Sequence, residues 1–200
     1  MNPVVLPAVH DLDAWCDLQS VVLVEGVSDR VALETLAMRR GRDLGAEGVA
    51  VVAMGGATNI GHFLVQLGDR RSSLRLAGLC DAGERAAFRR GLERVGLGTD
   101  LSDAGLEDLG FSICVDDLED ELIRALGTDR VEELLGSEGE LRSFRIFQQQ
   151  PAQTGRNAHR QLHRFMGTRS GRKAHFAKVL VEALDDDRVP RPLDRVLAIA

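Results

Sequence analysis

The sequence predicts an α/β fold: a mostly parallel sheet flanked by helices, followed by a helical C-terminal part. Short, wholly apolar segments such as SVVLV at 20–24 alternate with longer segments in which apolar residues recur at helical spacing. Unbroken short apolar runs are typical of strands buried on both faces, as in a parallel sheet. Strands that alternate with helices favour a doubly wound, Rossmann-like arrangement. Beyond about residue 117 the pattern is helical.

The elements follow from the local patterns. A helix over about 29–40, with Ser28 as its N-cap, is expected after the first strand. The tail 189–200 contains two prolines and is expected to be an extended arm before a final turn. Three further strands are predicted at 48–54, 74–80 and 110–115, with helices near 58–67 and 84–94 between them. Five C-terminal helices are predicted at 121–127, 129–136, 141–150, 157–167 and 171–184.

This pattern divides the chain into three parts: an N-terminal extension over 1–17, an α/β core over 18–127, and a helical part over 128–200 that packs on the core. The 200 residues are 44% hydrophobic and 28% charged, which is ordinary for a soluble globular chain. No apolar run approaches the roughly 18 residues of a membrane span, and the N-terminus lacks the features of a secretory signal.

The cysteines Cys16, Cys80 and Cys114 are odd in number and far apart, which favours reduced thiols over disulfides or a zinc site. We therefore expect a cytoplasmic protein that does not act at a membrane.

The net charge of −6 conceals an asymmetry along the chain. Residues 1–140 carry 13 Lys and Arg against 26 Asp and Glu, whereas residues 141–180 carry nine Lys and Arg and no acid. A solvated helical face that pairs with the acidic body would explain the basic segment. The alternative is a surface that binds a polyanion. On that alternative, Arg156, Arg160, Arg164, Arg169 and Arg172 would line a path for DNA phosphates.

Acidic residues follow three of the predicted strands. Glu25 ends the first strand, Asp81 the third, and Asp116 and Asp117 the fourth, while Asp29 lies in the first turn of the following helix. Ligand sites of parallel α/β sheets lie beyond the carboxyl ends of the strands. Oxygen ligands of this kind suit Mg²⁺ or Mn²⁺. Taken singly, Asp81 or Asp117 could simply form a turn or cap a helix, but the joint arrangement favours a metal site.

The ordered segments VEGVSDRVAL, LAGLCDAGE, VDDLEDEL and SGRKAHFA resemble the Toprim domain, and most closely that of the OLD (overcoming lysogenization defect) nucleases. The resemblance covers about residues 18–185. It implies that Glu25 and Asp29 bind one metal ion, and that Asp81 binds or bridges metal ions. Glu119, with Asp117 near it, would complete the acidic cluster. Lys173, one of only two lysines against 23 arginines, would stabilise the negative charge that builds up in the transition state.

The sequence departs from the family pattern in two ways. The second motif is usually Asp-x-Asp, but Gly83 occupies its second acidic position. Either Glu84 or the acidic cluster DLED at 117–120 rebuilds that metal site, or the site is lost; Asp116 is a further possible ligand. OLD nucleases also normally carry an ABC-type ATPase. GTRSGRKA at 167–174 lacks the glycine spacing of a P-loop, so any ATPase function would come from a separate partner.

Two histidines in the basic segment, His159 and His163, are four residues apart and would share one helix face, as zinc ligands can. No acid or cysteine lies near them in the sequence, so packing or a solvent-exposed role is the favoured interpretation.

The function that we predict is Mg²⁺- or Mn²⁺-dependent hydrolysis of DNA phosphodiesters by a nicking or cleaving endonuclease with two metal ions. Glu25 and Lys173 are the predicted catalytic residues. A homodimer would let one subunit act on each strand. One alternative is a weakly catalytic or non-catalytic Toprim module that docks on an ATPase. Another is a nucleotidyl transferase or an RNA-processing hydrolase on the same fold.

Overall fold

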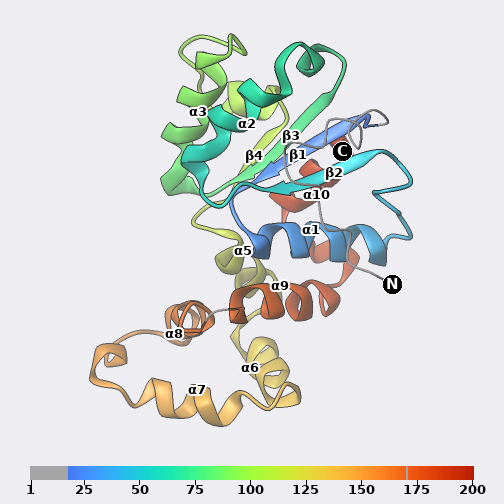
Figure 1. Ribbon diagram of the computed structural model, residues 1–200. Coiled ribbons are helices and arrows are strands. Elements are labelled where there is room, and N and C mark those ends of the chain that lie inside the picture. The colour runs from blue at the N-terminus through green and yellow to red at the C-terminus, as the bar shows by residue number, and fades with distance from the viewer. Residues whose placement is uncertain (1–17, 170) are drawn as a thin grey trace.

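The structure is a computed structural model, which describes residues 18–169 and 171–200. The predicted extension over 1–17, with Cys16, lies outside these residues. The described residues form a four-stranded sheet (Figure 1). Its strand order is β2-β1-β3-β4, and all neighbouring strands are parallel. The predicted α/β fold with a helical C-terminal part is confirmed. The strands are β1 (Ser20–Val24), β2 (Val49–Ala53), β3 (Arg75–Cys80) and β4 (Phe111–Ile113).

The sheet is covered on both faces, as the apolar strand sequences predicted. In β1, Val21 and Leu23 face one hydrophobic cluster and Val22 and Val24 face the other, because successive side chains in a strand point to opposite faces. The first cluster is formed with α2 (Ile60–Leu67), α3 (Arg85–Arg94) and α4 (Asp103–Asp108). The second is formed with α1 (Val27–Arg39) and the C-terminal helices.

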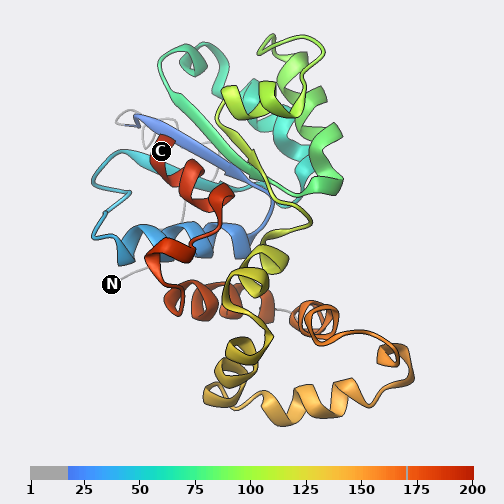
Figure 2. The same cartoon turned by 180° about the vertical axis from the view of Figure 1, so that it is seen from behind.

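The C-terminal helices leave the sheet and then return to it. In Figures 1 and 2, α5 leads away from β4, and α6 to α8 form an arm below the sheet. Helix α9 packs along α1, and α10 packs against β3 and β4. The bounds of these helices are α5 (Leu118–Leu126), α6 (Thr128–Ser137), α7 (Leu141–Gln148), α8 (Ala158–Met166), α9 (Arg172–Glu182) and α10 (Arg191–Ile199). Short 3₁₀ helices are η2 (Ala57–Asn59), η3 (Gly68–Ser72), η4 (Ala82–Glu84), η5 (Pro151–Gln153) and η6 (Asp186–Arg188).

The prediction of an extended arm at 189–200 is wrong, because this segment forms helix α10. Its two prolines, Pro190 and Pro192, lie at the N-cap and in the first turn, where the backbone N–H has no partner within the helix. Leu193, Val196 and Leu197 are buried at helical spacing against the sheet. The prolines therefore start the helix instead of preventing it.

Two smaller predictions also need correction. Helix α1 begins at Val27 with Gly26 as its N-cap, not at 29 with Ser28. Helix α4 was not predicted, although Ser102 caps it by accepting a hydrogen bond from the N–H of Gly105. Within the described residues, no helix is long and apolar enough to cross a membrane.

Candidate active site

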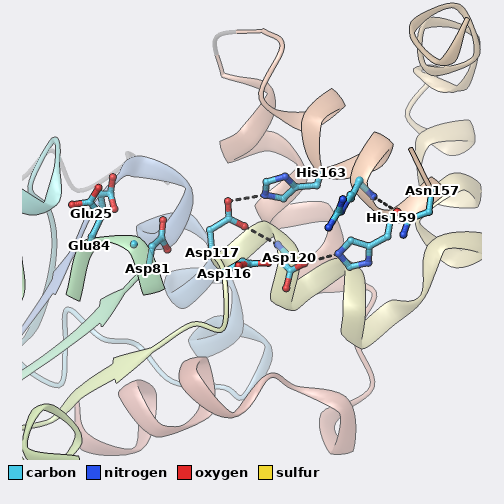
Figure 3. A pocket seen from close by; sticks show the side chains of 11 residues that line it. Glu25, Asp81, Glu84, Asp116, Asp117, Asp120, Asn157, His159 and His163 are labelled. Carbon is cyan, nitrogen blue, oxygen red and sulfur yellow. Dashed lines mark hydrogen bonds and ion pairs between the residues drawn. The ribbon is translucent and has the colours of Figure 1, made fainter. Parts of the chain in front are cut away.

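The carboxyl ends of β1, β3 and β4 open onto a pocket of about 510 Å³. Figure 3 shows Glu25 and Glu84 at one end of this pocket, Asp81 beside them, and two histidines of α8 at the other end. The connections from β1 and β3 lead to opposite faces of the sheet, and ligand sites of α/β sheets lie at such a point. The pocket is lined by Glu25, Asp81, Gly83, Glu84, Asp116, Asp117, Asp120, Asn157, His159, Arg160 and His163.

Asp29 lies behind Glu25, in the first turn of α1. One of its oxygens, Oδ2, accepts a hydrogen bond of 2.8 Å from the N–H of Gly26, and the residue is only 8% exposed. Burial raises its pKa to about 7, the Gly26 hydrogen bond opposes that rise, and the charges of Glu119 and Glu25 add to it. This carboxylate therefore fixes the turn after β1 and interacts electrostatically with two others.

Asp81 and Glu25 are the acids that directly end the central strands. Burial raises the pKa of Asp81 to about 8, and the charges of Asp29 and Glu25 raise it further. The pKa of Glu25 is also raised, first by burial and then by the charge of Glu84. Carboxylates that raise one another's pKa in this way are stabilised by a bound cation.

Glu119 is the most buried acid of the group, with 3% of the residue exposed. It lies in the first turn of α5, where Oε2 accepts a hydrogen bond of 3.1 Å from Nζ of Lys173, on α9. Its other oxygen, Oε1, is buried without a partner among the described residues. Burial lowers the pKa of Lys173, because it disfavours the charged ammonium. The charge of Glu119 and its hydrogen bond outweigh burial and keep the pKa above its ordinary value.

Asp117 and Asp120 differ from these acids because their charges are already compensated. Oδ1 of Asp117 accepts the N–H of Asp120 at the start of α5, and Oδ2 lies 2.7 Å from Nε2 of His163. Asp120 pairs in the same way with Arg124 and with Nε2 of His159, at 2.6 Å. Burial raises the pKa of both carboxyls, but these donors outweigh it and lower the pKa of each below its ordinary range.

The carboxylates of this site are the kind of oxygen ligand that a divalent cation such as Mg²⁺ prefers. In residues 18–169 and 171–200, no three His, Cys, Asp or Glu side chains already surround a common point as metal ligands. Two buried carboxylate oxygens nevertheless have no hydrogen-bond partner, Oε1 of Glu119 and Oε2 of Glu25. Unpaired buried carboxylate oxygens fit a hard cation, and the raised pKa of Glu25 agrees with such a site.

Arg172 is removed from the predicted DNA path. The residue is 7% exposed, its guanidinium stacks over the ring of Phe165, and it pairs with Glu140 at 3.0 Å. It also donates to the backbone oxygen of Phe165 and to Thr168. A buried arginine whose two terminal nitrogens already have partners joins helices and is unavailable to a phosphate.

The other four arginines of the predicted path lie at the surface. Arg156 donates to the backbone oxygen of Ala152, Arg169 lies 3.6 Å from Glu140, and Arg164 is exposed outside the pocket. Of the five, Arg160 lines the pocket.

Sequence reasoning missed Asp120 and Asn157 and left the two histidines unpartnered. His159 and His163 receive their acids from α5, about 40 residues earlier, because α5 and α8 pack together. The spacing of the acids, at 117 and 120, matches the spacing of the histidines on a helix face. That match is consistent with pairing between the two helices, but the sequence does not show that α5 and α8 pack together.

Comparison with known proteins gives three results. Residues 19–76 match the model described as overcoming lysogenization defect protein-like, TOPRIM domain. The fold is that of an OLD-like Toprim domain. The structure of the C-terminal region of the Xanthomonas campestris pv. campestris OLD protein aligns with a TM-score of 0.66 at 22% identity, over 91% of this chain and 94% of that one. A second structure also aligns, and no curated protein sequence matches the chain.

That second structure is the C-terminal region of the Burkholderia pseudomallei OLD protein. It aligns with a TM-score of 0.64 at 20% identity, over 92% of this chain and 99% of that one. Both alignments run through the helical arm as well as the sheet. At these identities the likeness shows the shared fold, and the chemistry rests on the residues of this chain.

Proposed function

We propose that this OLD-like Toprim domain is a metal-dependent endonuclease or nickase that hydrolyses DNA phosphodiesters. Toprim domains of OLD proteins are generally nuclease domains, and such domains typically bind divalent metal ions. The observation that carries the proposal is the convergence of Glu25, Asp81 and Glu119 with Lys173. These four side chains come from β1, β3, α5 and α9, and their charges act on one another's pKa values.

The acids have distinct parts in the proposed site. Glu25, Asp29, Asp81 and Glu119 would hold Mg²⁺ or Mn²⁺, and Glu84, Asp116 and Asp117 stand at the same edge. One or two such ions supply Lewis-acid stabilisation of the charge on the reacting phosphate. Glu84 lies in the pocket next to Gly83, so it is the residue we propose to replace the missing second Asp.

Lys173 has a place that suits charge stabilisation. Its side chain is 47% exposed, yet Nζ is held at 3.1 Å from the buried Glu119. An ammonium fixed in this way by a carboxylate stays protonated and keeps N–H groups for a further acceptor. We propose that it stabilises the negative charge that develops in the transition state.

The test is cleavage of supercoiled plasmid with Mg²⁺ or Mn²⁺ by the wild type, Glu25→Gln and Lys173→Gln. We expect metal-dependent nicking that falls by about 100-fold or more in both variants. Lys178→Gln is the matched control, because Lys178 lies on the same helix and its one ion pair in the described part of the chain is with Glu182, 3.8 Å away. Failure of the folded wild type to cleave with either metal would overturn the proposal.

One observation favours a second candidate, a Toprim module that docks on a separate ABC-type ATPase and has little activity itself. Gly83 lacks the second acid of its motif, and both oxygens of Asp117 already accept hydrogen bonds. Isothermal titration calorimetry with Mg²⁺ and Mn²⁺ separates the two candidates. Metal binding that Asp81→Asn removes supports the nuclease, and absence of metal binding supports the docking module.

A further inference from the structure

Helix α8 forms the wall of the pocket that faces the acidic strand ends. Asn157 caps this helix, since its Oδ1 accepts the N–H of Arg160 at 2.9 Å. His159 and His163 then bind Asp120 and Asp117 of α5. A carboxylate only accepts hydrogen bonds, so each histidine donates its Nε2–H to its partner. These contacts hold α8 against the start of α5 (Figure 3), and Arg160 of the same helix lines the pocket.

Arg160 is the arginine that lines this pocket, and its guanidinium is unpaired. No hydrogen bond or ion pair among residues 18–169 and 171–200 involves that guanidinium, although six acidic residues line the same pocket. Arg124 and Arg172 are each bound to acids, and Arg164, whose guanidinium also has no partner among these residues, lies outside the pocket. A guanidinium left free at the wall of an acidic pocket is available to an anionic ligand.

Phosphate is the anion that fits this position. The planar guanidinium of Arg160 matches two phosphate oxygens, and its permanent positive charge favours a negative ligand at this wall. The strand-end acids repel a phosphate. When no metal ion is bound, the positive charge of Arg160 on the opposite wall therefore decides where a phosphate can lie.

We propose that Arg160 binds the phosphodiester next to the scissile one in the substrate strand, and that His159 is the positioning residue that holds the helix of Arg160 at this wall. The proposal rests on the proposed function, because it names how the same site takes its DNA substrate. Arg156, Arg164 and Arg169 lie outside the pocket and would contribute only general attraction to the backbone.

The experiment measures binding without cleavage. A short fluorescein-labelled DNA duplex is titrated with the wild type and Arg160→Ala in EDTA, with fluorescence anisotropy as the signal. We expect the dissociation constant to rise about tenfold in Arg160→Ala, and the slope of log K against log salt to fall by about one. Arg130→Ala is the control, since Arg130 is exposed on α6 and pairs with Glu133.

Neutral linkages locate the contact. One methylphosphonate is placed at each position of the strand in turn, and binding is measured for the wild type, Arg160→Ala and Arg164→Ala. We expect one linkage beside the cleaved bond to weaken wild-type binding about tenfold and to have no effect in Arg160→Ala. The effect of that linkage should persist in Arg164→Ala, because the loss of affinity in this variant is spread over all linkages.

His159 is tested through Arg160. His159→Ala should remove the linkage-specific effect, and His159→Gln, which keeps a side-chain N–H, should restore part of it. In the Arg160→Ala background neither variant should change binding further, because a positioning residue acts only through the residue that it positions.

The proposal is overturned if the linkage effect persists in Arg160→Ala, or if Arg130→Ala weakens binding as much. These outcomes are separate from the nuclease test. A wild type that cleaves DNA while Arg160→Ala keeps the linkage effect would remove the phosphate subsite and leave the nuclease intact. The opposite result is a wild type that never cleaves DNA but shows a linkage effect that disappears in Arg160→Ala. It would leave the phosphate subsite and remove the nuclease.

Discussion

Two groups of acids lie in or directly behind the same pocket but have opposite environments. At the strand ends, burial and mutual repulsion raise the pKa of Asp29 to about 7 and that of Asp81 to about 8. At the start of α5, donors from α8 and from α5 itself lower the pKa values of Asp117 and Asp120. The charge of Lys173 compensates the first group only in part, whereas each acid of the second group has a direct side-chain partner.

The difference distinguishes acids that form a binding site from acids that hold the fold together. Acids held together without compensation destabilise the fold, so their retention favours a function that needs a cation. Compensated acids stabilise the fold, and here they attach the helical arm to the edge of the sheet. The same residue type therefore serves binding at one end of the pocket and assembly at the other.

The largest expected effect comes from Asp81→Asn. We expect metal-dependent cleavage to fall by at least about 100-fold. The same variant should raise the melting temperature of the metal-free protein at pH 8, because it removes a buried charge that repels its neighbours. Plasmid nicking and calorimetric unfolding test the two parts. A lower melting temperature at pH 8 would break the comparison, since it would show that Asp81 is already compensated.

The metal-free protein should lose stability between pH 5.5 and pH 8.5. Asp29 and Asp81 have folded pKa values above their ordinary value of 3.8, so their contribution is fully present below about pH 4 and is lost as the pH rises through 7 and 8. Saturating Mg²⁺, at about 100 times its dissociation constant, should restore about 2.7 kcal/mol at pH 8.5 and less at pH 5.5, where protons compete. Urea unfolding at both pH values measures this.

The stability contributed by His163 also falls as the pH rises. The hydrogen bond to Asp117 raises the pKa of His163, although burial opposes the rise. Asp81→Asn separates the two sources. A pH dependence unchanged by this variant would assign the effect to His163 and Asp29.

Asp117→Ala should have the opposite sign from Asp81→Asn and destabilise the metal-free protein by about 1–2 kcal/mol. The variant removes the N-cap of α5 and leaves His163 without its acceptor. Urea unfolding at pH 7 provides the measurement. A gain in stability would mean that Asp117 belongs with the uncompensated acids.

Gly83→Asp should have the smallest effect on the fold. A Cβ added at Gly83 meets nothing within 4 Å, and its backbone needs no positive φ, so packing and backbone geometry should change stability by no more than about 0.5 kcal/mol. In the metal-free protein the added charge should destabilise further, by repulsion from the strand-end acids. The new carboxylate would increase the number of acids at the strand ends and tighten Mg²⁺ binding several-fold. Calorimetric titration, with Gly83→Asn as the uncharged control, would show no difference between the variants if Glu84 already fills this role.

Much of the core was predictable because its signals are local. The apolar run of β1 and the acid that follows it lie within six residues, so strand, turn and helix could be placed from sequence. Helix α10 was not predictable in the same way. Its prolines indicate a break when taken alone, and only the burial of Leu193 and Val196 against the sheet shows that a helix begins there.

The sequence by itself determined the α/β pattern and the placement of Glu25 and Asp81 at strand ends, because hydrophobic periodicity and the parallel-sheet rule are properties of short segments. Tertiary structure decided how those acids differ from Asp117 and Asp120, which have the same side chain as Asp81. It also separated the buried Arg172 from the free Arg160, two arginines of one basic segment. Burial and partners set the charge state and availability of a side chain, and residues about 40 positions away in the chain supply both.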